Sequence, residues 1–283
     1  MKHCLVITAY KDVRMLNRLI AATPEDWGIF VHLDRKSPVR AEDVSHRARV
    51  FRWKKIHWGA PAHLEVMVQL LRTAFEAGEW DYFHLVSGQD FYAVAPSRFD
   101  EVLGTEGKNY IQCRPLPIEG FPWGQGLDIF RCRSICSWVD VRRRFWGRVD
   151  KLLFKVQKQC WLDRRLPGMA LYKGLVYCSL HRPFVGWVLS NGTAAGLLRR
   201  LRHSIVPEEV YFHTLIMNSP YKDTVENRHL RFDDWSGPAK PATLDASHAD
   251  AVIRSGALFC RKVETGVSDE LLRRLEIVIS DWK

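Results

Sequence analysis

Short polar segments follow three apolar runs that have the pattern of buried strands. The segments are residues 8–11, 34–37 and 87–90, and each comes directly after its run. Ligands of open parallel sheets bind beyond the carboxyl ends of the strands. The sequence therefore predicts a polar binding site along one edge of a sheet.

Two adjacent carboxylates, Glu208 and Glu209, are a second candidate for chemistry. They follow Ser204 and Pro207 and precede an apolar run at 210–217 that has helical spacing. Acids in the first turn of a capped helix stabilise it through the macrodipole, and a carboxylate is also a common general base. Neighbouring residues do not share a helix face, so we expect only one of the two to face a site.

The common nucleotide and hydrolase fingerprints are missing. The sequence has no GxxxxGK[ST], no GxGxxG after its first strand, no GxSxG, no HExxH and no Cys/His set with zinc spacing. It also lacks the Asp-x-Asp motif with which many sugar-nucleotide enzymes hold a divalent metal. A diphosphate ligand would therefore need basic side chains.

Alternating strands and helices are predicted to position these groups. Residues 4–9 and 29–34 read as strands with a helical pattern between them, and a helix within 57–75 precedes a third strand at 81–87. This order predicts an α/β fold with a mixed, mainly parallel sheet flanked by helices. Further along, residues 171–180 read as a strand that runs into a helix opened by Pro183, followed by a strand at 257–259 and a helix at 269–279.

The middle of the chain differs in composition and pattern. Residues 114–174 are rich in Pro and Trp and show no strand–helix alternation, so we expect an insertion within one domain spanning 1–283. Between 142 and 165 lie nine basic residues and two acidic ones, with apolar residues at the spacing of an amphipathic helix. This helix fits a solvated surface or an anionic membrane surface, and nucleic acid least, because no nucleic-acid motif accompanies it.

Composition sets the class of protein. The chain has 283 residues, a formal charge of +10, 47% hydrophobic residues and seven scattered Cys. These values exclude disordered, collagen and coiled-coil classes and favour one large domain. With no apolar stretch of membrane-spanning length, no signal peptide and no disulfide framework, we expect a cytoplasmic protein.

Five motifs in order resemble a known family. They are VHLDRKS at 31–37, Trp58-Gly59, SGQD at 87–90, SIVPEE at 204–209 before YFHTL, and SGALFCRK at 255–262. Together they resemble the core-2/I-branching β-1,6-N-acetylglucosaminyltransferases and their peptide O-xylosyltransferase relatives. The resemblance implies a GT-A-like, Rossmann-type fold, a UDP-sugar donor, inversion at the anomeric carbon and no metal cofactor.

The resemblance also implies roles for individual residues. Glu209 takes the place of the catalytic base, and Glu208 is then expected to be a solvated or capping partner. Asp34 corresponds to an acid near the uridine, although alone it reads as a turn cap. Thr8, Ala9 and Tyr10 would form the opposite wall of the base pocket.

Basic residues near the end of the chain would bind the diphosphate. Lys262, in the pair Arg261-Lys262, matches the residue that neutralises the leaving group. A second basic residue is needed, and Arg231 is favoured over Arg228 and Lys240.

The sugar side of the site is expected to involve polar and aromatic residues. Ser87, Gly88 and Asp90 would face the donor sugar or the acceptor, although Tyr92 stands where the family often has Pro. Trp123 and Trp235 can stack on a pyranose or belong to the core. His57, His84 and His213 lack metal spacing and read as structural.

The predicted activity is therefore metal-independent, inverting transfer from a UDP-sugar to a glycan or lipid-linked saccharide. N-acetylglucosamine is the leading donor sugar and xylose the second. A non-catalytic sugar-nucleotide or glycan-binding protein is the alternative from another class. Segment 142–165 would hold the protein peripherally at an anionic membrane surface.

Overall fold

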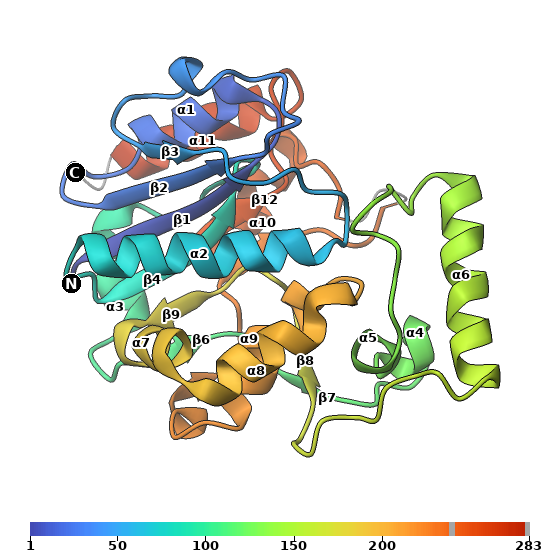
Figure 1. Cartoon of the computed structure of the whole chain (residues 1–283). Coiled ribbons are helices and arrows are strands. Elements are labelled where there is room, and N and C mark those ends of the chain that lie inside the picture. Colours follow the sequence, from blue (N-terminus) through green and yellow to red (C-terminus); the bar gives the residue numbers. More distant parts are fainter. Residues whose placement is uncertain (238–240, 281–283) are drawn as a thin grey trace.

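The main sheet is buried on both faces. The computed structural model describes residues 1–237 and 241–280, and Figure 1 shows the sheet with helices on either side. Its strand order is β10-β6-β9-β4-β1-β2-β3, with parallel pairing throughout β4-β1-β2-β3 and antiparallel pairing on both sides of β9. The strands are β1 His3–Ala9, β2 Gly28–Leu33, β3 Arg49–Phe51, β4 Tyr82–Ser87, β6 Asn109–Tyr110, β9 Ser179–His181 and β10 Val225–Glu226. The expected mixed, mainly parallel α/β fold is confirmed, and it is consistent with a GT-A-like architecture.

Successive residues of the central strands point to two different cores. Cys4 and Val6 of β1 pack on the side of α2 (Pro61–Ala77), whereas Leu5 and Ile7 pack on the side of α1 (Val13–Ala21) and α11 (Asp269–Ser280). This alternation follows from the two-residue period of a strand. Because both faces are covered by apolar cores, residues 4–7 of β1 form an uninterrupted apolar run in the sequence.

Two small sheets and several short helices complete the fold. One sheet joins β11 (Arg231–Asp233), β12 (Phe259–Arg261) and β5 (Asp90–Tyr92), and the other pairs β7 (Arg114–Pro115) with β8 (Tyr172–Lys173). The remaining α-helices are α3 Phe99–Leu103, α4 Pro122–Gln125, α5 Asp128–Arg131, α6 Arg144–Gln159, α7 Arg182–Ser190, α8 Gly192–Arg200, α9 Tyr211–Met217 and α10 Ala249–Arg254.

The prediction of a continuous strand at 171–180 is wrong. Residues in this range form β8 and β9, which belong to different sheets. The chain between them passes very close to its neighbours: the Gly174 N–H donates to the Glu209 carbonyl oxygen at 2.9 Å, and a Cβ on Gly174 would lie 1.8 Å from the Gln112 carbonyl oxygen. Only glycine fits there, and the strand is interrupted.

The capped helix start expected at 204–209 is also different. Pro207–Glu209 form a 3-10 turn, η4, and α9 begins only at Tyr211. Ser204 makes no cap: the residue that precedes η4 is Val206, and the Ser204 hydroxyl accepts a hydrogen bond from Arg164 at 3.2 Å. Val206 has a φ of 44°, so the chain turns sharply into the two carboxylates.

The basic segment does form a helix, but its apolar side faces outward. Helix α6 stands at the edge of the molecule in Figure 1, and its buried residues are Asp150, Phe154 and Gln157. Phe145 and Leu152, on the apolar side of this helix, are 66% and 60% exposed. None of the helices in the described part of the chain has the length and apolar character needed to cross a membrane. The division into one domain with an insertion at 114–174 stays a prediction.

Candidate active site

A cleft of about 1440 Å³ opens where β1, β2 and β4 end. Its floor includes the three polar segments that follow these strands, because parallel pairing brings Ala9 opposite Leu33 and Thr8 opposite Ser87. The predicted residues Thr8, Ala9, Tyr10, Asp34, Ser87, Gly88, Trp123, Glu209, Trp235, Arg261 and Lys262 all line it.

Asp34 is fixed by backbone groups at one side of the cleft. Its side chain is 6% exposed, and one carboxylate oxygen accepts the N–H of Lys36 at 2.9 Å and that of Ile56 at 3.4 Å. The second oxygen lies 3.8 Å from the Lys36 ammonium group, which lies 5.1 Å from the centre of the Tyr10 ring. Asp34 and the half-exposed Tyr10 ring thus form a wall of the cleft that has a carboxylate able to accept hydrogen bonds and a flat aromatic face.

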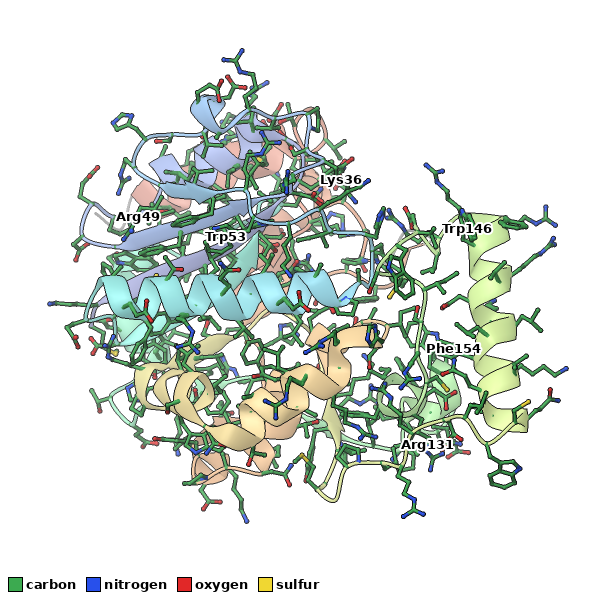
Figure 2. All side chains as sticks on the ribbon, in the orientation of Figure 1. Lys36, Arg49, Trp53, Arg131, Trp146 and Phe154 are labelled. Atoms are coloured by element: carbon green, nitrogen blue, oxygen red, sulfur yellow. The ribbon has the colours of Figure 1, made fainter. Side chains whose placement is uncertain are left out.

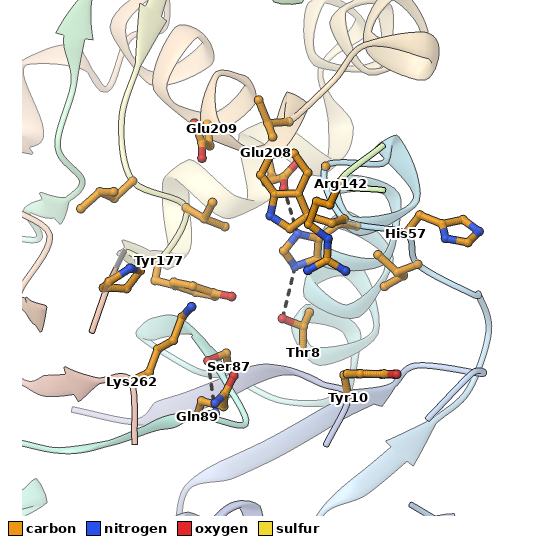
Figure 3. A pocket seen from close by; sticks show the side chains of 18 of the residues that line it. Thr8, Tyr10, His57, Ser87, Gln89, Arg142, Tyr177, Glu208, Glu209 and Lys262 are labelled. Atoms are coloured by element: carbon orange, nitrogen blue, oxygen red, sulfur yellow. Dashed lines mark hydrogen bonds and ion pairs between the residues drawn. The ribbon is translucent and has the colours of Figure 1, made fainter. Parts of the chain in front are cut away.

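Glu209 lies across the cleft from these strand ends (Figure 3). It forms an ion pair with Lys173. Burial raises the pKa of Glu209, and Lys173 offsets only part of this effect. A carboxylate with a raised pKa is a better proton acceptor than an exposed one. Lys173 reaches it from β8, which the Gly174–Glu209 backbone hydrogen bond joins to η4.

Glu208 is not the solvated or capping partner that the sequence predicts. Its side chain is 7% exposed, and one oxygen lies 3.1 Å from Nδ1 of His63. The other oxygen is buried without a hydrogen-bond partner in the described part of the chain. Both carboxylates reach the cleft because η4 is a single tight turn between His63 and Lys173, not the first turn of a regular helix.

His63 links the carboxylate turn to the floor of the cleft. Its Nε2 lies 3.3 Å from the Thr8 hydroxyl, so a chain of polar contacts runs from Glu208 to the end of β1 (Figure 3). Sequence reasoning missed His63, Lys173 and Tyr177. A signal was available for His63, because it lies in the first turn of a helix that starts directly after the Trp58-Gly59 motif.

Arg261 and Lys262 carry positive charge into the cleft from the end of β12. The Arg261 Nε donates to Asp90 at 2.9 Å, and its guanidinium group lies 4.1 Å from the centre of the Tyr177 ring. Lys262 points into the cleft (Figure 3). Burial and the neighbouring Arg261 lower the pKa of Lys262, and a negative ligand would reverse this effect.

Asp90 does not line the cleft as the sequence predicts. It is fully buried, and besides Arg261 it accepts the Ser87 N–H at 2.7 Å and the Ser87 hydroxyl at 3.0 Å. One carboxylate therefore fixes both the polar turn after β4 and the cation at the end of β12. Its place in the fold makes Asp90 a positioning residue.

Arg231, predicted as a diphosphate ligand, does not line the cleft. Its side chain lies in the core and donates to the Ser179 hydroxyl and to the carbonyl oxygens of Leu85, Cys178 and His229 at 2.7–3.1 Å. Arg228 does not line the cleft either, and Lys240 lies outside the described residues. Other cations at the cleft are Lys11, Lys36, Lys55, Arg114, Arg142, Arg143 and Lys173.

Aromatic side chains line the outer part of the cleft. Trp235 is 45% exposed, and its indole N–H donates to Asp233 at 2.7 Å. Trp123 packs edge-on against Phe121 with ring centres 6.0 Å apart. Trp138 and Trp146, which the sequence did not single out, also line this part. The cleft therefore contains several aromatic rings on which a pyranose ring can stack.

The three histidines expected to be structural differ in position. His84 and His213 are buried away from the cleft, and His213 is hydrogen-bonded to the Leu175 carbonyl oxygen at 3.0 Å. His57 lines the cleft. Within residues 1–237 and 241–280, no three His, Cys, Asp or Glu side chains are grouped so that they could hold a metal ion.

Comparison with known proteins relates the chain to glycosyltransferases. Residues 133–253 match the family model described as "Branch: Core-2/I-Branching enzyme". Xylosyltransferase 2 of Rattus norvegicus is 24% identical over 250 residues, which cover 82% of this chain and 26% of the relative. Xylosyltransferase oxt of Drosophila melanogaster is 24% identical over 244 residues, or 77% of this chain and 26% of the relative.

A third relative, xylosyltransferase 1 of Canis lupus familiaris, is 26% identical over 238 residues, covering 79% of this chain and 23% of the relative. The chain thus spans about a quarter of the length of these curated relatives. The resemblance to the core-2/I-branching family and its xylosyltransferase relatives is confirmed.

Proposed function

We propose that this chain transfers a sugar from a UDP-sugar to a hydroxyl group of a glycan or a lipid-linked saccharide, with inversion and without a metal ion. One observation carries the proposal: three kinds of group line a single cleft. They are the Asp34 carboxylate, which can accept hydrogen bonds, the cations Arg261 and Lys262, and the Glu209 carboxylate. These are the groups needed for the nucleoside, the diphosphate and the attacking hydroxyl.

The donor would lie along the strand ends. Asp34 would accept hydrogen bonds from ribose hydroxyls or the uracil N–H, with Thr8, Ala9 and Tyr10 forming the facing wall. Lys262 would contact the diphosphate, and Arg261, oriented by Asp90 and Tyr177, would add a second positive charge. Such fixed cations stabilise the negative charge that develops as UDP leaves.

Glu209 would act as the general base. The acceptor oxygen forms a bond to the anomeric carbon as the bond from that carbon to the UDP oxygen breaks, and the bonding electron pair leaves with UDP. The hydroxyl proton passes to the Glu209 carboxylate. Attack from the side opposite UDP inverts the anomeric configuration, which fits a base across the cleft from the strand ends.

The size of the cleft fits two substrates. Pockets for a single small ligand are commonly about 300–1,000 Å³, and this cleft is about 1440 Å³. The outer aromatic residues, with Trp123 and Trp235 among them, would bind the acceptor or the transferred sugar. N-acetylglucosamine is the donor sugar we favour, and xylose, named in the relatives above, is the alternative.

The test compares two neighbouring carboxylates. Glu209→Gln should lower transfer by about 100-fold or more, the contribution of a positioned general base, while UDP binding measured by calorimetry stays within about twofold. Glu208→Gln is the matched control and should retain transfer within about tenfold, because a glutamine can keep the hydrogen bond to His63.

Each outcome bears on a separate part of the proposal. Transfer is assayed with a panel of UDP-sugars, in EDTA and in manganese. UDP binding without turnover of any UDP-sugar would point to a non-catalytic sugar-nucleotide-binding protein. A larger loss in Glu208→Gln than in Glu209→Gln would assign the base to Glu208, and transfer that requires manganese would refute the metal-independent mechanism.

A further inference from the structure

Helix α6 exposes a continuous apolar stripe to solvent. The stripe consists of Phe145, Val149, Leu152 and Val156, at spacings of four, three and four residues. These residues fall on one side of a helix, and Phe145, Leu152 and Val156 are 66%, 60% and 39% exposed. Trp161 and Leu162, just beyond the helix, are 89% and 63% exposed. An apolar surface of this extent is uncommon on a soluble monomer and marks an interaction surface.

A different face fastens α6 to the rest of the protein. Asp150 accepts hydrogen bonds from the Ser134 hydroxyl at 3.1 Å and the Ile135 N–H at 2.9 Å. Gln157 bonds both the N–H and the carbonyl oxygen of Arg133 at 2.8 Å. Figure 2 shows Phe154 on this inner side, with other side chains of α6 projecting outward. The apolar stripe is therefore not needed to hold the helix in place.

The third face of the helix is basic. Arg144, Arg148, Lys151 and Lys155, which we call the basic row, are all exposed, and none makes an ion pair with another described residue. At about 100° per residue, the row runs beside the apolar stripe, and Arg148 is next to Leu152 on the helix surface. The one acid within α6 is the buried Asp150.

We propose that α6 lies on the surface of a bilayer that contains anionic phospholipids. The apolar stripe enters the boundary between headgroups and acyl chains, and the basic row contacts the lipid phosphates. Helices of this kind bind by combining buried apolar area with attraction to anionic lipid. Trp161 lies at the end of the helix, and Trp side chains favour this boundary.

Charge and apolarity together select this partner over nucleic acid. A nucleic acid would satisfy the basic row but would leave Phe145, Leu152 and Val156 in water. A bilayer satisfies both faces at once. Residues Arg142, Arg143 and Trp146 line the cleft, so the membrane-bound helix would begin at the edge of the cleft. The binding itself does not depend on the proposed transferase activity.

The experiment measures flotation of the full chain with vesicles of phosphatidylcholine, with and without phosphatidylglycerol. We expect binding to the anionic vesicles only, and weaker binding at about 0.5 M than at about 0.1 M salt. The stripe variant Phe145→Ser/Leu152→Ser should bind at least about tenfold more weakly. Its matched control, Ile253→Ser/Val267→Ser, changes two apolar residues that are 41% and 50% exposed elsewhere and should bind like the parent chain.

A second pair of variants tests the charge. Changing the four residues of the basic row to Gln should weaken binding by about 600-fold, since each basic residue near an anionic surface contributes about fivefold. The control changes four exposed basic residues elsewhere to Gln, namely Arg199, Lys222, Arg228 and Arg254.

If the basic-row variant and this control lost vesicle binding equally, a specific role of the basic row would be refuted. Absence of flotation with anionic vesicles, or tighter binding to an oligonucleotide that the stripe variant leaves unchanged, would overturn the membrane proposal.

Discussion

Replacing Lys173 by Met should shift the pH dependence of sugar transfer. Lys173 forms an ion pair with Glu209, and the two side chains are 10% and 26% exposed, so bulk water screens the pair only in part. Burial raises the pKa of Glu209, and Lys173 lowers it. An adjacent opposite charge lowers a carboxyl pKa by about 1–3 units, so loss of Lys173 should raise the pKa of Glu209 by a similar amount.

The sign of the effect follows from the role of the base. Glu209 accepts a proton only when ionised, so kcat/KM falls as the pH falls through its pKa. In Lys173→Met the acid limb of the kcat/KM profile should therefore move to higher pH by about 1–3 units. At a fixed pH below the Glu209 pKa of both the parent and the variant, kcat/KM should fall about tenfold for each unit by which that pKa rises.

The assay is the pH profile of kcat/KM, with UDP binding measured on the same samples. Lys173→Arg keeps the charge and should keep the acid limb within about one unit, which also separates an electrostatic effect from misfolding. Lys108→Met removes a lysine that pairs with Glu106 at 3.2 Å away from the cleft and should leave the profile unchanged. An acid limb that stays in place in a folded Lys173→Met variant would refute the assignment of Glu209 as the base.

Two further predictions concern stability. Asp90→Ala should lower the free energy of unfolding by about 3–5 kcal/mol in urea, because it leaves the Arg261 guanidinium group without its buried carboxylate, and an unchanged midpoint would contradict the positioning role. Gly174→Ala should lower the free energy of unfolding by about 3 kcal/mol or more, because the added Cβ would meet the Gln112 carbonyl oxygen. Gly196→Ala in α8 is the control: its Cβ would have nothing within 4 Å, so it should be neutral or stabilising by up to about 1 kcal/mol.

The long central strands could be predicted because they are buried on both faces. β1, β2 and β4 are largely apolar runs of six or seven residues, and the sequence predicted their carboxyl ends to within a few residues of where the strands end in the structure. This was sufficient to gather Thr8, Asp34 and Ser87 at one edge. Strands of two or three residues, such as β3, β6 and β10, are too short to show a period, so the sequence did not predict them.

Residues near the cleft were harder to assign when burial, not sequence position, decided their role. Arg231 is a charged residue beside a polar segment, which usually indicates exposure. In the fold it pairs in register with Phe259 of β12 and faces the core. Its two terminal nitrogens donate to four acceptors there, whereas its buried Nε has no hydrogen-bond partner among the described residues. Burial lowers the pKa of Arg231 to about 10. No local pattern shows which face of a three-residue strand is buried.

The outward-facing stripe of α6 shows what a periodic pattern does and does not determine. Spacing determines which side chains share a face of a helix, but the contacts of the helix determine which face is buried. In α6 the buried residues are Asp150, Phe154 and Gln157, and the two polar side chains hydrogen-bond backbone groups of Arg133 and Ile135. Once polar side chains anchor the helix, its apolar side is left for a partner outside the chain. An exposed apolar stripe beside four basic residues therefore points to recognition of a surface that is itself both apolar and negatively charged.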